Sequence, residues 1–139
     1  TFRLLRTLSA TPPASSVVIA FDASTHGGGA AIWIVPAHAI SELGGVPIEL
    51  PSACLSVTWT TGDEGLAQAR IGDCGSQARW EAFALLLAIR TWRSVLLASR
   101  GPVLAIGGAL GMMQGAVRFR SRDPAINLIF MEIAFIIGR

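Results

Sequence analysis

The chain has 139 residues, a length that suits one domain with its own hydrophobic core. Apolar residues make up 52% of the chain and the mean hydropathy is +0.56, which excludes an intrinsically disordered segment. The net charge is +2, and the 2 cysteines are too few for a disulfide framework or a four-thiolate zinc site. We therefore expect an intracellular protein, in the cytoplasm or the nucleus, that does not work through cysteine chemistry.

The start of the chain predicts a linker. Residues 1–16 end in the Pro- and Ser-rich sequence SATPPASS, which is typical of a connection to an upstream domain. They lack the continuous apolar core of a secretory signal. The longest apolar stretches, 83–89 and 125–137, are shorter than the roughly 20 residues that span a bilayer, so no membrane association is expected. We place the domain itself at 17–139.

Three strands are predicted in the first half of the domain. The apolar runs 17–22 and 29–35 flank the turn-forming sequence STHGG, which indicates an antiparallel hairpin. From 54 to 60, apolar and polar residues alternate, as in a strand with one exposed face. We expect this third strand to extend the antiparallel sheet, and the sequence between 61 and 76 to be rich in turns.

The second half predicts helices around one more strand. Residues 77–92 have helical periodicity, with Glu81 in the first turns on a side that is otherwise apolar. The run 102–106 indicates a buried strand of the kind that follows a helix in a parallel crossover. A weak helix is expected at 109–117, and Asp123 followed by proline predicts the start of a last helix.

This element order predicts an α/β fold that brings two carboxylates together. Three antiparallel strands, a helix and a parallel strand can place the end of the first strand, with Asp22, beside the first turns of the helix, with Glu81. Two desolvated carboxylates that face each other across the sheet edge repel, so the pair implies a divalent cation between them. Oxygen ligands favour Mg²⁺ or Mn²⁺.

Four segments carry a resemblance to a known family. They are VVIAFDASTHGGGAAIWIV, QARWEAFALLLAIRTW, GPVLAIGGALGMMQGA and RSRDPAINLIFMEIA. The first looks like an opening strand with a metal-binding Asp and a glycine-rich hairpin, and the second like a helix with the next acidic ligand. In this order they resemble the ribonuclease H domain of retroelement reverse transcriptases, within the ribonuclease H-like superfamily.

The resemblance implies a fold, an activity and partners. The fold would be the ribonuclease H-like mixed sheet with flanking helices. The protein would be a hydrolase, an endonuclease that uses two Mg²⁺ or Mn²⁺ ions to cleave the RNA strand of an RNA·DNA hybrid. Asp22 would bridge the metals and Glu81 would hold one of them. An upstream reverse transcriptase domain of a retrotransposon polyprotein would be a further partner. Hybrid shape and 2′-hydroxyl groups would be recognised by four residues of the hairpin: Ser24, Thr25, Gly27 and Gly28.

Two departures from the family pattern predict impaired catalysis. Gly108 stands where the family has its third carboxylate, and the sequence stops at Arg139, before the expected fifth strand and the last helix with the fourth acidic residue. The domain at 17–139 is therefore expected to be incomplete at its C-terminal end, with two of four acidic ligands. Because electrostatic stabilisation is usually the largest catalytic contribution, we expect a loss of about 10²-fold or more.

Two other functions remain open. The domain can be a non-catalytic module that binds nucleic acid or has a structural role. Alternatively, FDASTHGGG also resembles the phosphate-binding turn of sugar kinases and actin-like ATPases, which would make the chain a fragment of a nucleotide-binding protein.

Overall fold

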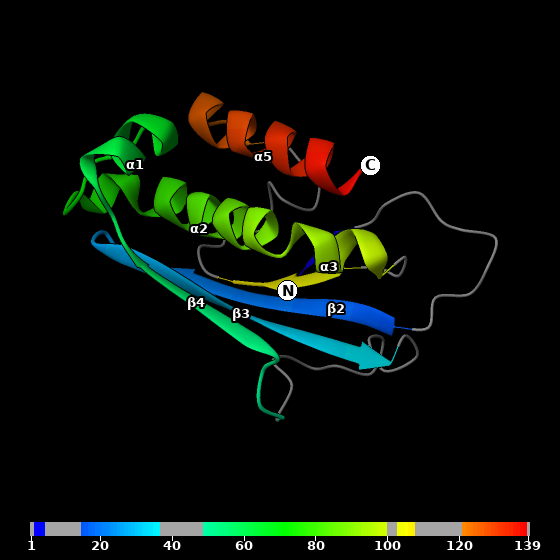
Figure 1. The fold of residues 1–139 in the computed structure, drawn as a ribbon. Coiled ribbons are helices and arrows are strands. Elements are labelled where there is room, and N and C mark those ends of the chain that lie inside the picture. Colours follow the sequence, from blue (N-terminus) through cyan, green and yellow to red (C-terminus); the bar gives the residue numbers. More distant parts are fainter. Residues whose placement is uncertain (1, 5–14, 37–48, 100–102, 108–120, 139) are drawn as a thin grey trace.

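The computed structural model describes residues 2–4, 15–36, 49–99, 103–107 and 121–138. Figure 1 shows a mixed sheet with its helices layered on one face. The predicted helix at 109–117 and Gly108 lie outside the described residues.

Within the described residues, the sheet has five strands, in the order β1-β5-β2-β3-β4. The strands β2, β3 and β4 are antiparallel neighbours, and β5 is parallel to β2. The predicted arrangement of three antiparallel strands and one parallel strand is therefore confirmed, as is the α/β class. The strands are β1 (Phe2–Leu4), β2 (Ser15–Ala23), β3 (Gly27–Pro36), β4 (Ala53–Thr58) and β5 (Val103–Ile106).

The structure corrects the expectation that residues 1–16 are only a linker. Within this predicted linker, Phe2–Leu4 forms β1, which pairs antiparallel with β5, and β2 already begins at Ser15. A strand of three residues is too short to show a period of two in the sequence. It forms here because β5 has a row of backbone N–H and C=O groups on the side away from β2, and pairing with β1 satisfies them.

Alternation along β2 separates the two faces of the sheet. Val17, Ile19 and Phe21 belong to the main hydrophobic core, together with the helices. Val18, between them, belongs to a smaller cluster with Trp33 and Leu104. We call the first side the helical face and the second the opposite face. Because successive side chains of a strand point to opposite faces, a residue's position in β2 fixes its side.

The helices form two layers over the helical face. The long helix α2 packs on β2 and β3, and α5 lies over α2 (Figure 1). The helices expected at 77–92 and after Asp123 are therefore confirmed. Among the described residues, no helix is long and apolar enough to cross a membrane. The helical segments are α1 (Thr61–Ala67), the 3₁₀ turn η2 (Cys74–Ser76), α2 (Gln77–Thr91), α3 (Arg93–Ala98) and α5 (Pro124–Ile137).

The short helix α1 was not expected, because 61–76 was predicted to be rich in turns. Its start is fixed by a capping box: the Thr60 hydroxyl accepts the N–H of Asp63, and the Asp63 carboxylate accepts the N–H of Thr60. Each bond satisfies a backbone N–H group at the helix start. The T-x-x-D spacing was the available signal, but Gly62 within it and Gly65 after it obscured the helix.

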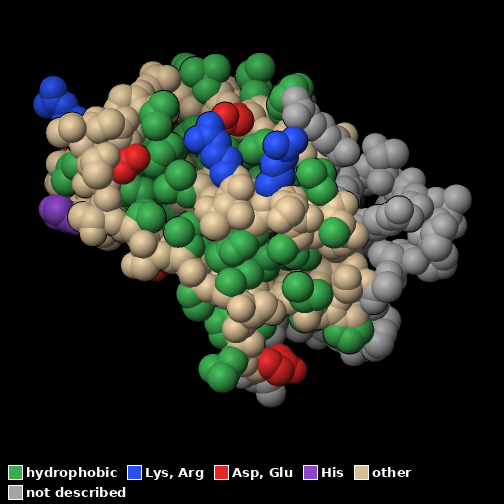
Figure 2. Space-filling view, in the orientation of Figure 1, with side chains coloured by type: hydrophobic (Ala, Val, Ile, Leu, Met, Phe, Trp, Pro, Cys, Tyr) green, Lys and Arg blue, Asp and Glu red, His purple; other side chains and the backbone are tan. Residues whose placement is uncertain are grey.

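The surface of the helical layer is largely apolar. Three large side chains of α5, at positions 128, 131 and 135, are 57%, 66% and 62% exposed. Figure 2 shows hydrophobic side chains reaching the surface over the helices, with few charged groups between them. Arg90 of α2 forms an ion pair with Glu132 of α5. The apolar residues of α5 therefore occupy part of its exposed face as well as the face that is buried on α2.

Asp123 fixes both the start of α5 and its position on α2. Its carboxylate accepts the N–H of Ala125 at 2.9 Å, as an N-cap does, and it pairs with the Arg79 guanidinium of α2 at 2.7 Å. Partial burial raises the pKa of Asp123, but the hydrogen bond and charge of Arg79 and the backbone N–H donors outweigh it. The pKa of Asp123 therefore lies below its ordinary value.

We predict that Asp123→Asn removes a pH-dependent part of the stability. A carboxyl whose pKa is lower in the folded than in the unfolded chain stabilises the fold above its unfolded pKa, near 3.8, and loses this effect as the pH falls through its folded pKa. Asparagine keeps the cap without the charge. Thermal melts should therefore show the wild type above the variant at neutral pH, with the two converging below about pH 4. A constant difference down to pH 2–3 would contradict the pairing.

Candidate functional site

Asp22 lies near the C-terminal end of β2, beyond the part of the strand that pairs with β5. Strand β2 makes its last pair with β5 at Ala20↔Ile106, so Asp22 is paired on one side, with Gly29 of β3. By alternation its side chain leaves β2 on the opposite face, where it is exposed, and its Oδ1 accepts the N–H of Ala23 at 2.9 Å. An exposed carboxylate at a strand end is available to a cation or to a polar ligand.

Glu81 is placed near the same strand end from the other side. It is 5% exposed, on α2, which packs on the helical face. The Gln77 side-chain amide donates to Glu81 Oε1 at 3.1 Å and also to the backbone carbonyl of Ala23. Through Gln77, the first turns of α2 are therefore attached to the residue that follows Asp22.

The structure thus brings the two predicted ligands to one end of β2, from opposite faces of the sheet. The expectation that they face each other across the sheet edge is therefore wrong, because alternation along β2 turns Asp22 away from α2. Their binding of a metal ion stays a prediction. Within the described part of the chain, no group of three or more His, Cys, Asp or Glu side chains is placed to hold a metal ion. The position of the third family carboxylate, Gly108, falls outside the described residues.

The turn between β2 and β3 is held by several hydrogen bonds. The Ser24 hydroxyl accepts the N–H groups of His26 at 3.1 Å and Gly27 at 3.2 Å. The indole N–H of Trp59 donates to the Ser24 carbonyl at 2.9 Å. Thr25 contacts His26 Nδ1 through its hydroxyl, at 3.2 Å. The predicted substrate-contact residues therefore form an ordered surface turn, directly after Asp22.

The glycines of this hairpin have a packing role. A Cβ at Gly27 would lie 2.5 Å from the carbonyl oxygen of Val57 in β4, and one at Gly28 would lie 2.8 Å from the Trp59 ring. Both distances are shorter than real Cβ contacts. Close packing of β4 and Trp59 is therefore sufficient to require glycine here. The expectation that these glycines admit a nucleic-acid backbone stays a prediction.

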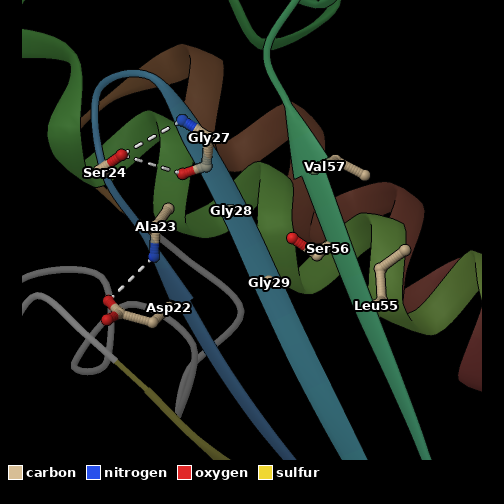
Figure 3. Close-up of a pocket in the computed structure, with 9 residues that line it drawn as sticks. All are labelled: Asp22, Ala23, Ser24, Gly27, Gly28, Gly29, Leu55, Ser56 and Val57. Carbon is tan, nitrogen blue, oxygen red and sulfur yellow. Dashed lines mark hydrogen bonds between the residues drawn. The ribbon is translucent and has the colours of Figure 1, made fainter.

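A hollow of about 410 Å³ lies beside Asp22 on the opposite face. Figure 3 shows Asp22 at one side of it and Ser56 of β4 at the other, with the glycines of β3 between them. Its residues offer one carboxylate, hydroxyls and backbone groups, and no basic side chain. Such a lining suits a polar or cation-bound group better than a bare anion. The lining residues are Asp22, Ala23, Ser24, Gly27, Gly28, Gly29, Leu55, Ser56 and Val57.

Sequence reasoning missed Gln77, although a signal was present. Gln77 and Glu81 are four residues apart on a helix, a spacing at which side chains meet. The contact with the Ala23 carbonyl had no signal in the sequence, because it depends on where α2 packs.

The comparisons with known proteins add no relative. No protein-family model, no curated protein and no solved structure matches the chain. The class that the fold itself defines is therefore the α/β class with a mixed sheet, and any function has to be argued from the site.

We predict that Gly28→Ala destabilises the protein by about 1–3 kcal/mol, the usual cost of overpacking, because the new methyl group would displace the Trp59 ring. Gly65→Ala in α1 is the matched control, since a Cβ at Gly65 meets nothing within 4 Å. The control should be neutral or more stable, as alanine is the better helix former. Urea unfolding of both variants measures the difference, and equal stabilities would show that Gly28 is not required for packing.

Proposed function

We propose that this chain is a ribonuclease H-like domain that binds RNA·DNA hybrids at the end of β2, with impaired metal-dependent cleavage of the RNA strand. One arrangement supports this function. The strand end with Asp22 and the helix turn with Glu81 are joined through Gln77, in a sheet of three antiparallel strands and a parallel strand. This is the context in which the family resemblance predicts two of its acidic ligands.

The two carboxylates suit Mg²⁺ or Mn²⁺. Both are oxygen donors, and Asp22 is exposed beside the hollow. Glu81 is buried, and a buried carboxylate is stabilised by a donor such as Gln77 or by a cation. In this proposal, Asp22 and Glu81 hold the metal. A bound ion supplies charge that stabilises the leaving oxygen and activates water.

The turn at 24–28 is the proposed contact with the hybrid. Its backbone is ordered by Ser24 and Trp59, and Ser24 and His26 are exposed. Duplex shape and 2′-hydroxyl groups can be recognised by hydroxyl and backbone groups without contacts to base edges. A cation between Asp22 and a phosphate would offset the negative charge of the hollow. An upstream reverse transcriptase domain and an intracellular location belong to the same proposal.

Binding without cleavage is the second candidate function. Two observations favour it. Only two of the four acidic ligands that the resemblance implies, Asp22 and Glu81, have been identified, and these two lie on opposite faces of the sheet. A non-catalytic module needs the ordered turn and no complete metal set. The two candidates share their binding surface and differ in whether RNA is cut.

We predict that the purified chain binds a fluorescently labelled RNA·DNA hybrid, with an affinity that falls as salt is added. Fluorescence anisotropy, with double-stranded DNA and ATP as comparison ligands, measures this binding. In Mn²⁺, RNA cleavage should be slower by about 10²-fold or more than that of a complete ribonuclease H. Asp22→Asn should remove the remaining cleavage, while the turn at 24–28 should still bind the hybrid.

Three results would contradict different parts of the proposed function. Cleavage at the rate of a complete enzyme, lost in Asp22→Asn, would contradict the impairment. Absence of hybrid binding would contradict the whole proposal. Affinity for ATP instead of hybrid would favour the nucleotide-binding alternative.

A further inference from the structure

Strand β4 is the outermost strand at one side of the sheet (Figure 1). Among the described strands it pairs with β3 alone, so its other side presents a row of backbone groups. Such an edge can accept a further strand, and proteins commonly prevent this with charged side chains, proline or a bulge. The sequence of β4, ACLSVT, has no charge and no proline, and its register with β3 has no bulge. The edge of β4 is therefore open to pairing.

The backbone groups that face outward can be assigned residue by residue. The backbone N–H of Trp59 donates to the carbonyl of His26 at 2.9 Å, toward β3. The carbonyl of Val57 also faces β3, because its oxygen lies 2.5 Å from the position of a Cβ at Gly27. Hydrogen-bonded and non-hydrogen-bonded residues alternate along an antiparallel pair. The backbone groups that face away from β3 therefore belong to Cys54, Ser56 and Thr58.

We propose that β4 is a dimerisation edge, at which a second copy of the chain pairs its own β4 antiparallel to the first. Ser56 then lies opposite its counterpart, on the twofold axis. The two sheets become one continuous sheet with both helical layers on the same face. Because the two copies use the same strand, the assembly closes as a dimer. This inference is independent of the proposed function, since it involves neither a metal nor nucleic acid.

The outward backbone groups determine the register. With Ser56 on the axis, Cys54 of each copy lies opposite Thr58 of the other. Every outward N–H and C=O group of these three residues then has a partner. A pairing centred on Leu55 would instead place Thr58 opposite Ser52, which lies outside the strand.

The side chains also match in this register. On the helical face, Leu55 lies opposite Val57 of the second copy, and both are partly buried apolar residues at the edge of the main core. On the opposite face, Ser56 meets Ser56, and the exposed Cys54 lies beside the exposed Thr58. Like charges directly opposite each other destabilise paired strands, and β4 contains none. A second copy therefore fits the edge in hydrogen bonding, polarity and charge.

The test is sedimentation velocity of the full chain at about 1–200 μM, which should show a monomer–dimer equilibrium. Ser56→Pro removes an N–H that faces away from β3, so it keeps the pairing with β3 and blocks the pairing between copies. Ser56→Lys places two positive charges opposite each other on the axis. Each variant should weaken the dimer by about tenfold or more. Circular dichroism melts check that both remain folded.

Met131→Lys is the matched control. It adds the same charge on α5, at a side chain that is 66% exposed, and should leave the dimer affinity unchanged. Loss of the dimer in this variant but not in the two Ser56 variants would place the interface on the exposed apolar side of α5 and overturn the inference. A chain that stays monomeric, or that assembles beyond a dimer, would overturn it as well.

A disulfide measures the register directly. Opposed residues of a hydrogen-bonded antiparallel pair have Cα atoms about 5.5 Å apart, within the range of a disulfide. In a Cys74→Ser background, Thr58→Cys should therefore give an oxidised dimer through Cys54 of the other copy. Cys74→Ser alone should not, because the two Cys54 residues would lie about 13 Å apart along the strands. Equal cross-linking of both proteins on non-reducing gels would overturn the proposed pairing.

Discussion

The packing of Trp59 holds together the parts of the structure from which a site can be built. Its ring is stacked on Trp80 of α2, with centroids 4.6 Å apart and planes within 10°, and it meets the edge of Phe83. Its indole N–H reaches the Ser24 carbonyl, and its ring covers Gly28. One side chain therefore joins the end of β4, the turn after β2 and the sheet-facing side of α2. Aromatic pairs of this kind add specific geometry to hydrophobic burial.

This packing determines what lies at the end of β2. With α2 fixed over β2 and β3, its first turn is placed so that Gln77 reaches the Ala23 carbonyl. The contact leaves Glu81 buried beneath the helix and Asp22 exposed on the other side of the same strand. The two carboxylates therefore have different surroundings. Glu81 depends on fixed hydrogen-bond partners, whereas Asp22 is open to solvent and to a ligand.

The two carboxylates would therefore contribute differently to the binding of a cation in the proposed function. A cation at this strand end would meet one exposed carboxylate beside an open hollow and one held from the helical face. An ordered turn with exposed hydroxyl and backbone groups lies next to them. In the proposed function, this surface would bind a nucleic-acid backbone with a cation, although the ligand set is insufficient for fast cleavage. Under that proposal, binding and catalysis would depend on different parts of the same region.

The sequence by itself determined the elements whose pattern is local. Alternation predicted β4 with Leu55 and Val57 turned to the core, periodicity predicted α2, and Asp123 with its proline predicted the start of α5. It also selected Asp22 and Glu81, because charged residues within apolar runs stand out. Tertiary structure alone decided the remainder. It decided the pairing of β1 with β5, the surroundings of Asp22, the two contacts of the Gln77 amide and the requirement for glycine at position 28. These features depend on residues that are distant in the chain. Such contacts depend on how whole elements pack, and no local period encodes them.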